Sequence, residues 1–163
     1  MNDFDWTSFT KRIAIRAGIA EIYDAWTKSE ELQKWFLEKA TFYNSDKSLE
    51  PRVSAYAGNS YTWIWYLYED AMNGRITAAN WKDFLQFTFE GECLVDVKLS
   101  EDNGYTIVEL RHHNIPTDDN SKKFIRLGCS NGWGFYLTNL KSIYEGGIDL
   151  RNKDSNLSPM INN

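Results

Sequence analysis

NGWGFYLTNLKSIYE, residues 131–145, is the stretch that decides the fold. Its large apolar side chains recur at steps of four, three and four residues: Trp133, Leu137, Leu140 and Tyr144. This spacing places them along one side of a helix, and the pair Gly146-Gly147 follows where a helix commonly ends in a left-handed residue. A helix with so broad an apolar face needs a large apolar surface against it, and the strands predicted upstream can supply that surface.

The segments upstream of this helix are predicted to be antiparallel strands joined by short turns, because apolar and polar residues alternate in them. The predicted strands cover residues 9–17, 39–43, 61–69, 75–81, 84–90, 93–100 and 105–115. Residues 61–69, YTWIWYLYE, are apolar or aromatic on both faces, which indicates that both faces are covered. Residues 70–74, DAMNG, predict a hairpin turn through their Asn-Gly pair.

Helical periodicity appears in two short segments after the first strand and again near the C-terminus. Residues 19–27 place their apolar side chains on one face, and Ser29 is a suitable N-cap for a second short helix. Glycines 128, 132 and 134 weaken the last helix. They predict either a kink or two pieces, with the main piece running from residue 131 or 132 to 145.

Length and composition indicate a single globular domain with a sizeable core. The chain has 163 residues, of which 42% are hydrophobic, 25% are charged and 15% are aromatic. The aromatic excess favours either an aromatic core or an aromatic-lined pocket. The formal net charge of −5 disfavours nucleic acid and anionic membranes as partners.

We expect a cytoplasmic protein without a metal or a cofactor. Cys93 and Cys129 belong to no Cys/His cluster, so a zinc site is unsupported, and free thiols in a reducing compartment are favoured over a disulfide. The first residues lack the apolar core of a signal peptide, and no apolar run approaches the length of a membrane span. Residues 1–147 are predicted to form the domain, and the Asn- and Ser-rich residues 148–163 to form a mobile tail.

Four motifs, in this order along the chain, resemble a known family. They are IAIRAGIAEIYDAW at 13–26, ELQKWF at 31–36, GYTIVELRHHNI at 104–115 and GWGFYLTNLKSIYE at 132–145. Together they resemble the START/Bet v 1-like (SRPBCC) superfamily and, within it, the AHSA1-like family of activator of Hsp90 ATPase homologues. The resemblance implies an α+β helix-grip fold, in which a curved antiparallel sheet of about six strands wraps around a long C-terminal helix, with two short helices after the first strand. The aromatic segment 61–69 departs from the glycine-rich strand that is usual in the family.

A fold of this kind can leave a cavity between the sheet and the last helix. The candidate ligand-binding residues are side chains that the periodicity predicts to face inward. They are Trp35, Phe36, Trp63, Trp65, Phe87, His112, Trp133 and Leu137. The alternative is that these side chains simply fill the core, because protein interiors are normally packed without voids.

His112 is the inward-facing ionisable group of the last strand and the only weak candidate for catalysis. It could bind a ligand oxygen or transfer a proton near neutral pH, but no carboxylate is in register with it, and a satisfied core histidine is the competing interpretation. His113 should face outward, so the two histidines cannot chelate one metal ion. Asp118 and Asp119 are expected to cap a helix start rather than to hold a cation.

These observations lead to three hypotheses of different classes. The first is non-catalytic binding of a small apolar or amphipathic, lipid-like ligand between the sheet and the last helix. The second is protein interaction, as a co-chaperone-like domain that binds a chaperone or as a homodimer, through the outer aromatic residues Tyr66 and Tyr68. The third is an enzyme that uses His112. The superfamily hosts lipid carriers, ligand sensors, cyclases and co-chaperone domains, so the resemblance bears on the fold more than on the function.

Overall fold

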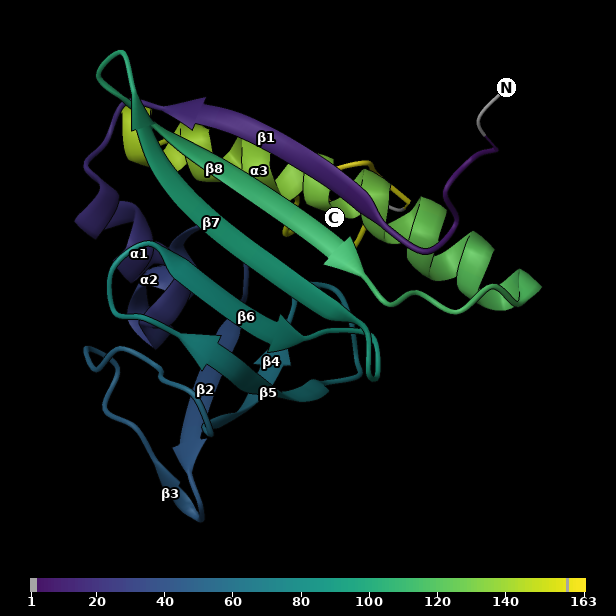
Figure 1. The fold of residues 1–163 in the computed structure, drawn as a ribbon, viewed down its shortest axis with the longest axis horizontal. Coiled ribbons are helices and arrows are strands. Elements are labelled where there is room, and N and C mark those ends of the chain that lie inside the picture. Colours follow the sequence, from purple (N-terminus) through teal and green to yellow (C-terminus); the bar gives the residue numbers. More distant parts are fainter. Residues whose placement is uncertain (1–2, 158) are drawn as a thin grey trace.

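The computed structural model describes residues 3–157 and 159–163. The strands are β1 (Phe9–Ile15), β2 (Lys39–Asn44), β3 (Lys47–Ser48), β4 (Ser60–Ile64), β5 (Met72–Ala79), β6 (Phe84–Thr88), β7 (Leu94–Asp102) and β8 (Tyr105–His113). The helical segments are α1 (Ile19–Thr27), α2 (Ser29–Trp35), the π-helical segment η1 (Ser121–Leu127) and α3 (Gly128–Gly146). Within the described residues the strands form one antiparallel sheet in the order β1-β8-β7-β6-β5-β4-β2-β3 (Figure 1). The α+β helix-grip fold is therefore confirmed, with eight strands in the sheet where about six were expected.

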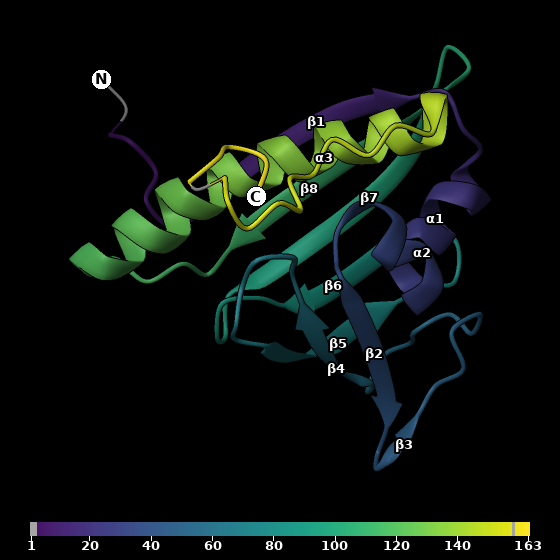
Figure 2. The same ribbon diagram turned by 180° about the vertical axis from the view of Figure 1, so that it is seen from behind.

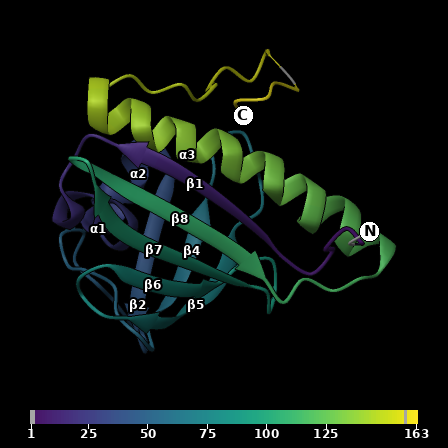
Figure 3. The same ribbon diagram turned by 45° about the horizontal axis from the view of Figure 1, so that its top comes forward.

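The long helix α3 lies beside β1 and β8, and α1 and α2 pack near its C-terminal end (Figures 1 and 3). Its buried face contains Trp133, Leu137 and Leu140, as the periodicity predicts. Tyr144, the last member of the predicted stripe, is half-buried, and its hydroxyl donates a hydrogen bond of 2.6 Å to Glu31 Oε2 on α2. The apolar stripe therefore joins the helix to the sheet and to α2.

The last helix is longer than the sequence predicts. The π-helical segment η1 leads directly into α3 at Gly128, so the main helix does not begin at residue 131 or 132. Packing of the apolar face against the sheet outweighs the low helix propensity of the glycines. Gly147, at φ 72°, ends the helix in the left-handed conformation, as predicted. Within residues 3–157 and 159–163, no helix combines the length and the apolar character that a membrane crossing would require.

The two cap predictions have different outcomes. Asp118 precedes η1, and its Oδ1 accepts a hydrogen bond of 3.0 Å from the Ser121 backbone N–H, as a capping carboxylate does. Asn120 lies directly before η1 and makes no side-chain cap hydrogen bond, and capping by Asp119 stays a prediction. The prediction for Ser29 is wrong. Ser29 is the first residue of α2, Lys28 occupies the cap position, and no side chain caps that helix.

The aromatic strand and the turn after it differ from the prediction. β4 ends at Ile64, and Leu67 has a φ of 67°, which an extended strand does not contain. The pair Asn73-Gly74 forms no hairpin turn, because it belongs to β5, where Gly74 lies opposite Tyr61. The Tyr61 ring covers the Gly74 backbone so closely that an added Cβ would overlap it. The glycine is therefore required by close packing and not by a turn.

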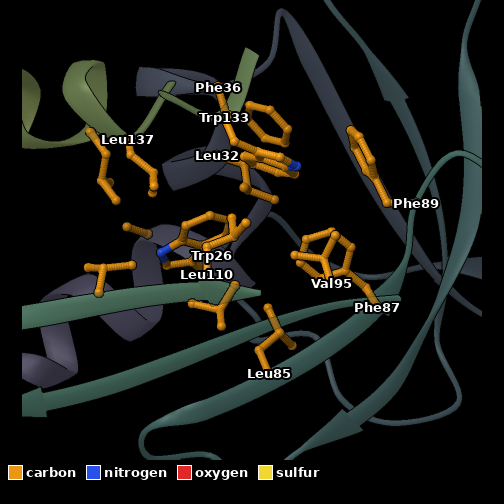
Figure 4. Packing of buried hydrophobic residues seen from close by; sticks show 14 of the residues in the cluster. Trp26, Leu32, Phe36, Leu85, Phe87, Phe89, Val95, Leu110, Trp133 and Leu137 are labelled. Carbon is orange, nitrogen blue, oxygen red and sulfur yellow. The ribbon is translucent and has the colours of Figure 1, made fainter. Parts of the chain in front are cut away.

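A continuous aromatic cluster fills the space between α1, α2, α3 and the sheet (Figure 4). Trp133 of α3 lies with its ring centroid 5.2 Å from that of Phe36 and 5.0 Å from that of Phe89. Trp26 of α1 packs edge-on against Trp35 of α2, at 4.7 Å between centroids. Aromatic pairs at these distances add stability beyond the burial of their area. The aromatic core expected from composition is therefore present.

We predict that Gly74→Ala destabilises the fold by about 1–3 kcal/mol, because the new methyl group must displace the buried Tyr61 ring. Urea unfolding measures this change. Gly146→Ala is the matched control, since a Cβ at that position meets nothing within 4 Å. Equal stability of the two variants would show that Tyr61 does not constrain residue 74.

Candidate ligand-binding site

A pocket of about 850 Å³ lies at the N-terminal end of α3. Six segments line it: the end of α2 at Phe36, the stretch from the β4–β5 loop into β5, the turn between β6 and β7, η1, the first turns of α3, and the end of the C-terminal tail. Pockets that bind small molecules commonly have volumes of roughly 300–1,000 Å³. The pocket therefore has the size of a small-molecule site, and it is open to solvent.

The pocket exists because α3 carries glycines on the face that borders it. Gly128 and Gly132 are one helical turn apart, and both line the pocket. A Cβ added at Gly132 would meet no atom within 4 Å, so a side chain there would extend into open space. The next lining residue on this face, Trp133, is buried and closes the pocket from below.

Aromatic side chains form a large part of the walls. Phe36 packs against Trp133 on one side and edge-on against Tyr136 on the other, at 5.0 Å between centroids for the second pair. Trp65 packs edge-on against Phe36 at 5.3 Å and against Phe89 at 6.1 Å. Because each ring is held by at least one other ring, the walls are largely preformed.

Polar groups line part of the pocket, among them the carboxylates of Asp70 and Glu90. The indole N–H of Trp133 is buried and has no acceptor among the residues that the structure describes. The Tyr136 hydroxyl donates a hydrogen bond of 3.2 Å to the Asn163 carbonyl oxygen at the mouth. Burial raises the pKa of the Cys129 thiol to about 12, so this cysteine is protonated at neutral pH and is a poor nucleophile.

Only part of the predicted set of ligand-binding residues lines this pocket. Phe36, Trp65 and Trp133 do so. The other members are buried in the core away from its surface: Trp35, Trp63, Phe87, His112 and Leu137. Binding by any of these residues stays a prediction. Sequence reasoning missed Gly128 and Gly132, although their spacing of four residues on a helix face indicated a strip without side chains.

His112 is 0% exposed and packs between the Phe9 and Phe89 rings, at 5.2 and 5.8 Å between centroids. Neither ring nitrogen has a hydrogen-bond partner in the described part of the chain. Burial lowers its pKa to about 4, so the imidazole is neutral at pH 7. His113 lies on the opposite face of β8, where its Nε2 is 3.1 Å from Asp96 Oδ1. The described residues contain no group of three or more His, Cys, Asp or Glu side chains that could hold a metal ion.

The C-terminal tail is attached to the domain through Arg151. Its buried guanidinium donates hydrogen bonds of 3.0 Å to the carbonyl oxygens of Leu37, Gln33 and Lys34, where α2 ends. It also pairs with Asp149 at 2.8 Å. Burial raises the pKa of Asp149, but hydrogen bonds from Arg151 and Lys153 outweigh this effect and hold the pKa below its ordinary value. The domain boundary at 147 and the mobility of the tail stay predictions.

From this anchor the tail runs back along α3 (Figure 2). Its described end brings Met160, Ile161 and Asn163 to the mouth of the pocket. The backbone N–H of Asn152 donates a hydrogen bond to the Asn162 carbonyl oxygen at 2.6 Å, which folds the tail into a loop. The tail therefore contributes one wall of the pocket.

A second hollow, of about 530 Å³, lies at the turn between β7 and β8. Arg16 and Tyr105 line it, and the Arg16 Nε–H donates a hydrogen bond of 2.9 Å to the Tyr105 hydroxyl oxygen. Because these two groups already satisfy each other and are exposed to solvent, this hollow offers less to a ligand than the pocket at α3.

The fold and the pocket define a helix-grip protein with an aromatic-walled site beside its last helix. The family model described as "Activator of Hsp90 ATPase homolog 1-like protein" matches residues 16–145. The chain therefore belongs to this family, as the motifs predicted. No protein of curated function matches the chain.

Solved structures with the same fold include proteins of low sequence identity. The protein SSP2350 from Staphylococcus saprophyticus has a TM-score of 0.70 and 18% identity, over 88% of this chain and 96% of that one. The Aha1 dimer from Colwellia psychrerythraea has a TM-score of 0.66 and 19% identity, over 86% and 97%. DynU16, from the dynemicin biosynthetic locus, has a TM-score of 0.69 and 16% identity, over 90% of this chain and 50% of that one. At these identities the likeness shows the fold alone.

We predict that acid destabilises the protein through His112. The unfolded chain binds a proton at this histidine below about pH 6.5, whereas the folded chain does so only near pH 4. The stability that the neutral His112 contributes is therefore fully present above pH 6.5. As the pH falls to 4, the free energy of unfolding decreases by about 3 kcal/mol. Urea unfolding from pH 7 to pH 4.5 should show a weaker pH dependence for His112→Phe than for the wild type. An unchanged slope in His112→Phe would contradict the prediction.

We predict that Arg151→Met destabilises the protein by about 2–4 kcal/mol, because it leaves the Asp149 carboxylate and several carbonyl groups without their partner. Urea unfolding measures the change in the free energy of unfolding. Limited proteolysis should show faster cleavage after residue 152 in the variant than in the wild type. Lys153→Met is the control, because Lys153 is exposed and its pair with Asp149, at 3.0 Å, lies near the surface. If the two variants lose equal stability, Arg151 is not the anchor.

Proposed function

We propose that the chain binds a small, largely apolar or amphipathic ligand in the pocket at the start of α3, without covalent chemistry. The observation that carries this proposal is the glycine face of α3 opposite aromatic walls. Gly128 and Gly132 each cost about 1 kcal/mol of helix propensity relative to alanine. The space that they leave open is a reason for glycine at both positions.

The side chains that line the pocket favour binding of an apolar ligand body over a chemical reaction. Trp65, Phe89 and Tyr136 offer ring faces and edges, which bind apolar groups by contact area. The nucleophile nearest to the ligand space, Cys129, is protonated, and His112 lies behind Phe89 and has no carboxylate partner. A lipid-like ligand fits this composition, and binding without catalysis is the simpler interpretation.

Protein interaction is the second candidate, as a co-chaperone-like domain or as a homodimer. The family name and the dimer of the Colwellia psychrerythraea protein support it. So do three exposed apolar side chains at the pocket mouth, Tyr68 at 57%, Phe124 at 62% and Ile161 at 96% exposure. Tyr66, the other residue predicted for this role, is covered by Arg151 and Lys153, at 5.1 and 4.7 Å from its ring centroid. Light scattering at high concentration tests the homodimer, and a monomer would argue against it.

Two variants at one position, Gly132→Leu and Gly132→Ala, test whether the ligand binds in the pocket. Comparing their dye binding and their stability separates a loss of binding from a loss of the fold. Leucine should extend into the pocket, narrow it, and weaken the binding of the uncharged dye Nile red at least about tenfold. Alanine should leave dye binding near that of the wild type, since one methyl group occupies little of the space. Dye fluorescence titration gives the affinity.

Both substitutions replace a helical glycine, so both variants should unfold at the same or higher urea concentration than the wild type. Retained stability excludes loss of the fold as the cause of weaker binding. If Gly132→Leu binds the dye as tightly as the wild type, the pocket is not the binding site.

A further inference from the structure

The charged groups that line the pocket are of one sign. Asp70 and Glu90 contribute carboxylates, and no lysine, arginine or histidine is among the described lining residues. Neither carboxylate has an ion-pair or hydrogen-bond partner in residues 3–157 and 159–163. The pocket therefore offers unpaired negative charge beside an apolar surface.

Each carboxylate is attached to a segment that also supplies an aromatic wall. Glu90 follows Phe89 in the turn between β6 and β7, where its φ is 55°. Glu90 is exposed overall, and partial desolvation of its carboxylate raises its pKa. Asp70 belongs to the loop that carries Trp65 and Tyr68. Negative charge and ring surface therefore occur together on two segments of the pocket wall.

The aromatic rings favour the same sign of ligand charge as the carboxylates. The face of an aromatic ring attracts a cation, and quaternary ammonium groups are commonly bound by several such rings together. Trp65, Tyr68 and Tyr136 line the same pocket as the two carboxylates. Among the described lining residues, an anionic headgroup would find neither a base to pair with nor a favourable ring face.

Two further polar groups lie inside the pocket wall and outside the pocket, respectively. Trp133 contributes a buried indole N–H without an acceptor inside the pocket wall, which suits an ether, ester or hydroxyl oxygen in the ligand body. At the outer rim, the Lys123 ammonium lies 5.1 Å from the ring centroid of Phe124. Lys123 is exposed and is not a lining residue.

We propose that the pocket selects an amphiphile whose polar end is cationic, such as a lipophilic amine or a quaternary ammonium compound, over an anionic one such as a fatty acid. The inference rests on the proposed binding of a ligand in this pocket. The cationic end lies at the mouth between Asp70 and Glu90, and the apolar body lies against Trp133 and Phe89.

Calorimetric titration with three probes of equal chain length tests the proposal. Dodecyltrimethylammonium, dodecyl maltoside and dodecanoate supply a cationic, a neutral and an anionic end, each used below its micelle concentration. The wild type should bind the cationic probe about tenfold more tightly than the anionic probe. The preference should decrease with added salt, because the carboxylates lie at a solvent-exposed mouth.

Asp70→Asn combined with Glu90→Gln should remove most of this preference. The matched control is Asp46→Asn combined with Glu50→Gln, which removes the same charge near β3, at the far edge of the sheet from α3 (Figure 1). The control variant should keep the preference, which separates a local effect from the net negative charge of the chain.

The outcomes distinguish this inference from the function on which it rests. Equal affinity for the three probes, or equal preference in the two double variants, would overturn the inference and leave the pocket in place. If the Gly132→Leu variant loses the cationic probe, the binding occurs in this pocket. If no probe binds the wild type, the proposed function fails, and the inference fails with it.

Discussion

The packing of Trp133 against Phe36 and Phe89 is the contact on which the arrangement of this protein depends. Its ring lies 5.2 and 5.0 Å from theirs and 5.9 Å from Trp26, so a single side chain of α3 touches the end of α2, the end of β6 and α1. Losing a buried tryptophan of this kind typically costs about 3–5 kcal/mol. The contact fixes α3 against the sheet, and the same ring forms the floor of the pocket.

The packing of Trp133 explains why glycines at Gly128 and Gly132 keep the pocket open. With Trp133 fixed in the core, the residues one and five positions before it face the loop after β4 and the tail. Large side chains there would fill the pocket, whereas Gly132 and Gly128 leave it open. The helix tolerates them because packing of Trp133, Leu137 and Leu140 stabilises it from one side. The π-helical segment before Gly128 shows that the backbone is least regular at the pocket.

Periodicity predicted the fold well and the site less well, for one physical reason. Alternation in a strand or a helix says which side chains point inward, and Trp63, Phe87 and His112 do point inward. It cannot say which inward side chains touch each other and which border empty space, because that depends on three-dimensional packing. The end of β4 at Ile64 was also hidden from the pattern. The aromatic residues after it continue the alternation, although Leu67 turns the chain away from the sheet at φ 67°.

Several polar atoms in the aromatic core lack hydrogen-bond partners, and one of them borders the pocket. Trp26, Trp63 and Trp133 each bury an indole N–H, and His112 buries two nitrogens, without partners in the described residues. An unsatisfied buried polar group costs about 1–3 kcal/mol, and phenylalanine or leucine would avoid that cost. Of these residues only Trp133 lines the pocket. It is therefore the one whose polar atom a ligand in this pocket could satisfy directly, and it combines structural support, pocket floor and hydrogen-bond donor in a single side chain.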